Sequence, residues 1–187
     1  MENKMFCYQC QETANCSGCT VSGVCGKKPE VAAMQDLLVY ATKGLSAVAQ
    51  QLRAEGKEVS QELNHRVTMN LFITITNANF DNDAIIENIK ETFALRDAVR
   101  ATLSDSSKLP KAATVEVAEK DYPIFAQSIG VLATENEDIR SLRELITYGL
   151  KGLAAYSKHA NALLKDDGNV DAFIQKALTK TLDDSLS

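Results

Sequence analysis

The sequence predicts an all-α protein of two helical bundles, with a cysteine-rich loop at its N-terminus. Three observations support this fold class. Apolar residues recur every three or four positions in five long segments, which is the spacing of amphipathic helices. Proline, which interrupts helices, occurs only three times in 187 residues. One helical pattern occurs twice, in residues 37–47 and again in residues 145–155.

Residues 1–28 are the first predicted unit, a loop folded around a metal. They are rich in cysteine and glycine and show little apolar periodicity. All five cysteines of the chain lie in this stretch, at Cys7, Cys10, Cys16, Cys19 and Cys25. An odd number of thiols so close together suits metal ligation better than a disulfide framework.

Residues 29–104 are predicted to form the first bundle. Pro29 suits the first turn of a helix, and Gly56 suits its C-terminal exit. Asp81 is a good N-cap for the third helix. Residues 71–76, near the end of the second helix, also have the composition of a strand. The helices are expected over residues 29–55, 60–77 and 82–103.

Residues 105–135 are predicted to be a connection, with a short extended piece at 114–117. The second bundle follows over residues 136–187. Thr134 and Glu137 have the spacing of a capping box before its first helix. The two helices of this bundle are expected over residues 137–164 and 170–182, separated by a polar turn at 166–169.

The repeated pattern relates the two bundles to each other. Residues 37–47 and 145–155 are identical at six of eleven aligned positions. The matches include Tyr40 with Tyr148, expected as packing residues, and a lysine–glycine pair that follows each tyrosine. The repeat therefore suggests that a long helix of related sequence opens each bundle.

Composition and charge exclude several function classes. The net charge is −5, and no stretch forms a basic stripe, so nucleic acid is not an expected partner. No run reaches the ~18 apolar residues of a membrane span, and no secretory apolar segment opens the chain. Clustered thiols are expected to stay reduced in the cytoplasm, which is the predicted location. The two histidines, His65 and His159, lie in no ligand motif and are expected at the surface.

The spacing of the cysteines favours an iron–sulfur cluster over its alternatives. Thiolate is a soft ligand that suits both iron–sulfur clusters and zinc. Structural zinc sites usually pair two Cys-x2-Cys knuckles at a longer separation than the one between Cys10 and Cys16. A zinc site built from these two knuckles would also leave Cys25 without a role as a ligand. Zinc and unmetallated thiols remain the less favoured alternatives.

The residues around the cysteines resemble a known family. The segments that carry the resemblance are Phe6-Cys7-Tyr8-Gln9-Cys10-Gln11-Glu12-Thr13, Gly18-Cys19-Thr20, Gly23-Val24-Cys25-Gly26-Lys27 and, further along the chain, residues 137–156. Together they resemble the start of the hybrid cluster proteins, also called prismane proteins or hydroxylamine reductases. Members of that family are much longer, so the chain resembles their N-terminal domain only.

The resemblance implies a particular cofactor and ligand set. A [4Fe–4S] cluster is expected on Cys7, Cys10, Cys19 and Cys25, with Cys16 left as a nearby non-ligand. The hybrid iron–sulfur–oxygen cluster of the family is bound by later domains, so it is expected only in the full-length relative. The first domain of the family consists of two three-helix bundles. The second bundle of this chain is therefore expected to be truncated by one helix.

The resemblance also implies a function. The chain is expected to be the electron-transfer domain of a hydroxylamine reductase, which converts hydroxylamine to ammonia and is connected with nitric oxide and nitrosative stress. No residue is assigned as catalytic, and the chain alone is expected to be inactive as an oxidoreductase, because no cysteine follows Cys25. The alternatives are a stand-alone iron–sulfur binding, electron-transfer or interaction module, and a zinc-stapled interaction domain.

The expected partners are a redox donor protein, the remaining domains of the full-length enzyme, and a second copy of the chain. Self-association is expected because a bundle lacking one helix leaves an apolar groove. The side chains predicted to be only partly covered in this groove are Leu142, Leu145, Leu153, Phe173, Ile174 and Leu178.

Overall fold

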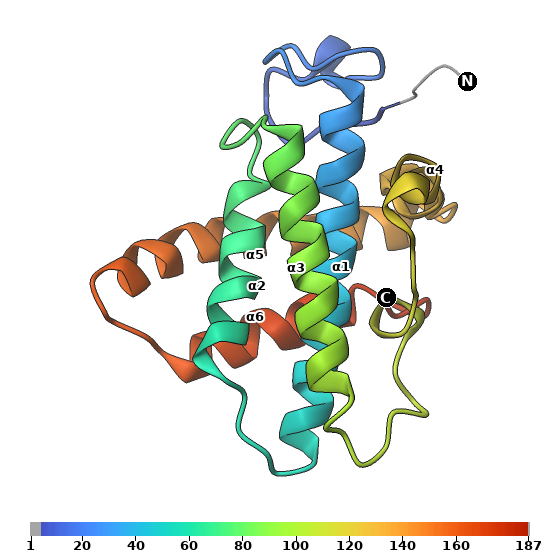
Figure 1. Ribbon diagram of the computed structural model, residues 1–187. Coiled ribbons are helices and arrows are strands. Elements are labelled where there is room, and N and C mark those ends of the chain that lie inside the picture. Colours follow the sequence, from blue (N-terminus) through green and yellow to red (C-terminus); the bar gives the residue numbers. More distant parts are fainter. Residues whose placement is uncertain (1–4, 187) are drawn as a thin grey trace.

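The computed structural model describes residues 5–186 and confirms the all-α fold class (Figure 1). Within those residues no strand forms, and the one β-bridge joins Cys7 to Cys19. No helix in the described part of the chain is both long and apolar enough to cross a membrane. The helices are α1 (Pro29–Ala54), α2 (Gln61–Ile73), α3 (Asn82–Arg100), α4 (Tyr122–Ile129), α5 (Glu137–Ala162) and α6 (Gly168–Lys180), with 3₁₀ helices η1 (Ala14–Cys16), η2 (Lys111–Ala113), η3 (Glu119–Asp121) and η4 (Val131–Ala133).

Helices α1, α2 and α3 run side by side, while α5 and α6 cross them (Figure 1). Helix α1 is central and contacts α2, α3, α4 and α6. Its start and end follow the predicted rules, because Pro29 occupies the first turn and Gly56, with a φ of +73°, lies just beyond the end. The cysteine-rich loop lies at the end of the bundle where α1 begins.

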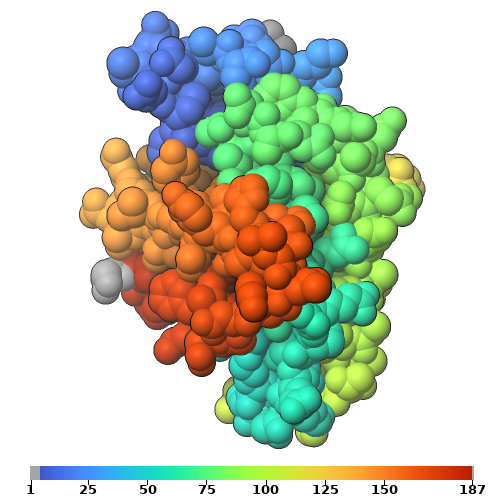
Figure 2. All heavy atoms as spheres, turned by 90° about the vertical axis from the view of Figure 1, so that its left-hand side faces the viewer, coloured from blue at the N-terminus to red at the C-terminus, as the bar shows by residue number. Residues whose placement is uncertain are grey.

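A common apolar core joins the two sets of helices. Leu45 of α1 and Leu71 of α2 are fully buried in it, together with Ile174 and Leu178 of α6. Leu150 and Ala154 of α5 complete the same cluster. Helices α5 and α6 thus bury their apolar faces against α1 and α2, and Figure 2 shows them lying across that face of the first three helices. The division into two bundles with the predicted boundaries stays a prediction.

The sequence predicts six partly covered side chains in a groove along α5 and α6, and this prediction is wrong for two of them. Ile174 and Leu178 are buried, at 1% and 0% exposure, because α6 docks on α1 rather than facing outward. The other four residues are at least partly exposed, as predicted. Leu145 and Phe173 are exposed, and Leu142 and Leu153 are half-buried. The exposed apolar surface therefore lies mainly on α5, where Tyr148 and Tyr156 extend it.

Helix α4 was not predicted. Its eight residues lie inside the expected connection, and Tyr122 and Ala126 are buried against α1. The segment is too short to show a helical period clearly, and Pro123 at its start resembles a loop signal. The expected strand character of residues 71–76 and 114–117 is absent from the structure, since α2 ends at Ile73 and the second segment has no regular structure.

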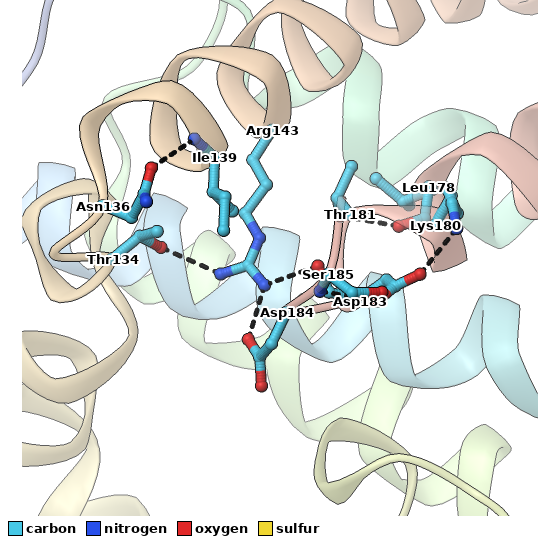
Figure 3. Close-up of polar contacts among 10 residues, drawn as sticks. All are labelled: Thr134, Asn136, Ile139, Arg143, Leu178, Lys180, Thr181, Asp183, Asp184 and Ser185. Atoms are coloured by element: carbon cyan, nitrogen blue, oxygen red, sulfur yellow. Dashed lines mark hydrogen bonds and ion pairs between the residues drawn. The ribbon is translucent and has the colours of Figure 1, made fainter. Parts of the chain in front are cut away.

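The predicted capping box at the start of α5 is also wrong. The N-cap is Asn136, whose side chain accepts a hydrogen bond from the Ile139 amide at 3.0 Å (Figure 3). The Thr134 hydroxyl instead accepts from the Arg143 guanidinium at 3.0 Å. Arg143 also donates to the carbonyl oxygen of Asp183 at 2.9 Å and to the Asp184 carboxylate at 2.7 Å, which ties the segment after α6 to α5.

Candidate metal centre

The cysteine-rich loop closes on itself through Cys7 and Cys19. The Cys7 amide donates to the Cys19 carbonyl oxygen at 3.1 Å, and the Cys19 amide donates to that of Cys7 at 2.8 Å. The Thr13 hydroxyl adds a third bond, to the Cys7 carbonyl oxygen at 3.0 Å. Two cysteines twelve positions apart are thereby fixed side by side through their backbones.

Cys19 is the most buried of the five thiols. Its exposure is 4%, and it packs with Met5 and Ala32 in a small apolar cluster beneath the loop. The backbone amide of Ala14 points at its sulfur at 3.5 Å. The pKa of the Cys19 thiol is lowered, first by this amide and next by that of Val24, because N–H groups stabilise a thiolate. The backbone around Cys19 therefore favours the thiolate form of this side chain.

The other cysteines lie progressively closer to the surface. Cys7 and Cys10 are half-buried, Cys16 and Cys25 are exposed, and all five are free thiols. Cys16 has a φ of +55°, a left-handed backbone conformation at the end of η1. Among residues 5–186, no three His, Cys, Asp or Glu side chains converge closely enough to hold a metal ion.

The donor chemistry of the loop nevertheless fits an iron–sulfur cluster. All five thiols lie within one short loop at one end of the bundle, and the buried one already receives N–H donors at its sulfur. The assignment of Cys7, Cys10, Cys19 and Cys25 as ligands, and of Cys16 as a non-ligand, stays a prediction.

The loop glycines serve close packing and turns. A Cβ on Gly18 would lie 2.5 Å from the Phe6 ring, and one on Gly23 would lie 3.0 Å from the Cys25 sulfur. Their amides are already used within the loop, because Gly18 donates to Ala14 at 3.2 Å and Gly23 donates to Lys27 at 2.8 Å. The amides directed at the Cys19 sulfur are those of Ala14 and Val24, which are not glycines.

Two neighbouring lysines at the end of the loop have different environments. Lys27 is 1% exposed, and its ammonium lies 5.9 Å from the centre of the Phe80 ring. Lys28 is exposed. Only Lys27 is therefore a buried positive charge close to Cys25.

Sequence reasoning missed the charged groups beneath the loop. Lys151 of α5 is 5% exposed, and burial lowers its pKa to about 8. Asp36 of α1 has a pKa raised to about 7, again first by burial. Lys151 occupies a repeated position, which is the one signal in the sequence that singles it out. No comparable signal marks Asp36, which lies just before the repeat.

The histidines and repeated tyrosines do not contribute to the loop. The His65 imidazole lies 2.7 Å from the Asp166 carboxylate, and exposed His159 packs edge-on against Phe72. Tyr40 packs edge-on against Phe125, as expected of a packing residue. Tyr148 is 55% exposed, so its predicted packing role is not met within residues 5–186.

Comparison with known proteins agrees with the resemblance at the cysteines. The Prismane/CO dehydrogenase family matches residues 5–187. The hydroxylamine reductase of Desulfovibrio desulfuricans (strain ATCC 27774 / DSM 6949 / MB) is 56% identical over 188 residues, covering 100% of this chain and 34% of the relative. Hydroxylamine reductase 2 of Clostridium acetobutylicum is 49% identical, covering 98% of this chain and 36% of the relative.

The hydroxylamine reductase of Clostridium perfringens is 50% identical, and the match covers 98% of this chain and 34% of that relative. The chain thus spans about a third of the length of the curated relatives it matches. The match includes the cysteine-rich loop and every helix described above. The chain belongs to the Prismane/CO dehydrogenase family.

Proposed function

We propose that this chain is the iron–sulfur electron-transfer domain of a hydroxylamine reductase. The observation that carries the proposal is the folded cysteine loop, in which Cys7 and Cys19 are paired through their backbones and the Cys19 sulfur receives an N–H donor. The names of the relatives, all hydroxylamine reductases, supply the reaction.

The proposed cofactor is a [4Fe–4S] cluster held by Cys7, Cys10, Cys19 and Cys25. Such a cluster accepts and donates one electron at a time. The protein supplies the thiolates, the Ala14 amide directed at one sulfur, and a buried positive charge on Lys27. Hydrogen bonds and positive charge near the sulfurs both favour the reduced, more negative state.

Reduction of hydroxylamine to ammonia and water consumes two electrons and two protons. We place that step in the other two thirds of the full-length relatives, where the hybrid cluster is expected, and we assign no catalytic residue to this chain. The proposed role of the domain is to relay electrons from a redox donor protein. The reduced thiols suit a cytoplasmic setting.

Anaerobic reconstitution with ferrous iron and sulfide tests the proposal. The expected product contains about four irons and four sulfides per chain, absorbs broadly near 400 nm, and gives a paramagnetic signal on one-electron reduction. Zinc binding without any uptake of iron and sulfide would overturn it in favour of a zinc-stapled domain. Hydroxylamine reduction should require the full-length relative, so this chain alone serves as the inactive control.

A further inference from the structure

Lys151 connects three separate parts of the chain beneath the cysteine loop. Its ammonium donates to the carbonyl oxygen of Thr74 at 2.9 Å and to the side-chain oxygen of Gln9 at 3.2 Å. Lys151 belongs to α5, Thr74 is the C-cap of α2, and Gln9 lies in the two-residue spacer between Cys7 and Cys10. Figure 2 shows the orange helix α5 directly below the blue loop.

The contact with Thr74 explains how a lysine can be buried here. The last carbonyl groups of a helix lack partners and carry partial negative charge. The Lys151 ammonium satisfies one of them at the end of α2. Burying a lysine is still costly, as its lowered pKa of about 8 shows, so the position is expected to serve more than packing.

The contact with Gln9 points to the loop. Gln9 is half-buried and flanked by two of the proposed ligands, so a bond to its side chain restrains the spacer between them. The titratable groups that face Lys151 are Asp36 of α1, Glu144 of its own helix, Lys27 of the loop and the Cys7 thiol. Two buried lysines, Lys27 and Lys151, therefore lie on the inner side of the loop.

Lys43 gives an internal comparison. It occupies the position in α1 that matches Lys151 in the repeat. It lines a different cavity, of about 440 Å³, with Arg143 and Glu144. A lysine at this repeat position is thus not sufficient for loop contact, because half-buried Lys43 does not contact Gln9 and buried Lys151 does.

We propose that Lys151 is a positioning residue for the cysteine loop: it anchors the spacer between Cys7 and Cys10 through Gln9, and its charge raises the reduction potential of the cluster bound there. The anchoring part depends only on the observed contacts, whereas the electrostatic part rests on the proposed function. A cluster held by four thiolates is anionic, and a nearby buried positive charge stabilises the added electron.

The test compares Lys151→Met, Lys151→Arg and Lys43→Met with the wild type. In the metal-free proteins, amide hydrogen exchange of residues 6–10 should accelerate several-fold in Lys151→Met only. In the reconstituted proteins, the potential of Lys151→Met should shift to more negative values, and Lys151→Arg should restore it. Gln9→Leu, which keeps the lysine, should accelerate exchange of the spacer with a smaller shift in potential.

The outcomes separate this inference from the proposed function. If hydrogen exchange of residues 6–10 in Lys151→Met equals that of the wild type, the anchoring role is overturned. If the reduction potential of Lys151→Met is unchanged, the electrostatic role is overturned. Neither result contradicts the proposed cluster. A wild type that takes up no iron overturns the proposed function and the electrostatic role together, and the exchange data then still decide the anchoring role. If circular dichroism shows that Lys151→Met does not fold, two other variants decide. Unchanged hydrogen exchange of residues 6–10 in Gln9→Leu overturns the anchoring role. A reduction potential of Lys151→Arg as negative as that of Lys27→Met, a variant that lacks a buried charge, overturns the charge effect.

Discussion

Gly44 of α1 lies so close to the carbonyl group of Ala112 in η2 that no residue with a side chain would fit at position 44 without displacing it. A Cβ on Gly44 would lie 2.1 Å from the Ala112 oxygen and 2.6 Å from its carbon. The same oxygen accepts a hydrogen bond from the buried Arg96 guanidinium at 3.1 Å. The connection after α3 is thus held rigidly against the middle of α1.

Gly44→Ala is expected to destabilise the protein by about 1–3 kcal/mol, since the added methyl group would displace the Ala112 backbone. The matched control is Gly152→Ala, at the equivalent position of α5, where nothing lies within 4 Å of the new Cβ. That variant should be neutral or gain up to about 1 kcal/mol, because alanine favours helix more than glycine. Urea unfolding measures both. Equal effects of the two substitutions would contradict the close contact.

The proposed ligands make a second prediction. Cys7→Ala, Cys10→Ala, Cys19→Ala and Cys25→Ala should each remove most of the absorbance near 400 nm after reconstitution, because a cluster with three thiolates is held less tightly. Cys16→Ala is the control and should retain the absorbance. Loss of absorbance in Cys16→Ala together with its retention in Cys19→Ala would show that the ligand set is wrong.

Glu55, at the end of α1, predicts an acid-sensitive contribution to stability. Its carboxylate accepts from the Lys57 ammonium at 2.7 Å and from the amides of Ser104 and Asp105 at 2.9 and 3.2 Å. These donors, Lys57 first, lower its pKa to about 2. Since the folded pKa lies below the unfolded value of about 4.3, the stabilisation is complete above that pH and is lost as the pH falls towards 2.

Glu55→Gln should therefore lower the urea midpoint at pH 6, and the difference from wild type should shrink steadily between about pH 4.5 and 2. Glu58→Gln is a suitable control, because Glu58 is exposed and lies in the same segment. A difference between Glu55→Gln and wild type that stays constant with pH would argue against a charge effect.

Helices with strong end signals and long apolar periods could be predicted closely from the sequence. Helix α3 begins after Asp81, whose side chain caps two amides as expected, and α1 differs from its prediction by one residue at its C-terminal end. Helix α4 could not be found in this way, because eight residues give too little periodicity. The choice between Thr134 and Asn136 as a cap depended on which side chain Arg143 engages, which is a tertiary contact.

The site was predictable in its ligand types but not in its surroundings. The spacing of the cysteines identifies a thiolate loop, because soft-metal sites need several such ligands close together. Which lysines lie beneath it depends on where α5 crosses the bundle. Nothing in the neighbouring sequence separates buried Lys27 from exposed Lys28, or gives Lys151 a partner in Gln9.

The internal repeat also shows which surface of α5 lacks cover. Leu37, Ala41 and Gly44 of α1 are buried by α3 and η2. Their counterparts on α5 are Leu145, Gly149 and Gly152, and all three are exposed. The same side of the repeated helix is thus a packing surface in one copy and open in the other within residues 5–186.

We expect this surface of α5 to mediate self-association of the chain. Leu145 is 69% exposed and Tyr148 is 55% exposed, and Gly149, next to Tyr148, leaves room for another helix to approach closely. Contiguous apolar surface of this kind tends to recruit a partner. Sedimentation equilibrium at micromolar concentration should show dimers, which Leu145→Lys combined with Tyr148→Lys should dissociate. Leu164→Lys, which changes an even more exposed leucine beyond the end of α5, should leave the dimer intact. A wild type that sediments as a monomer throughout would show that the open face needs no second copy.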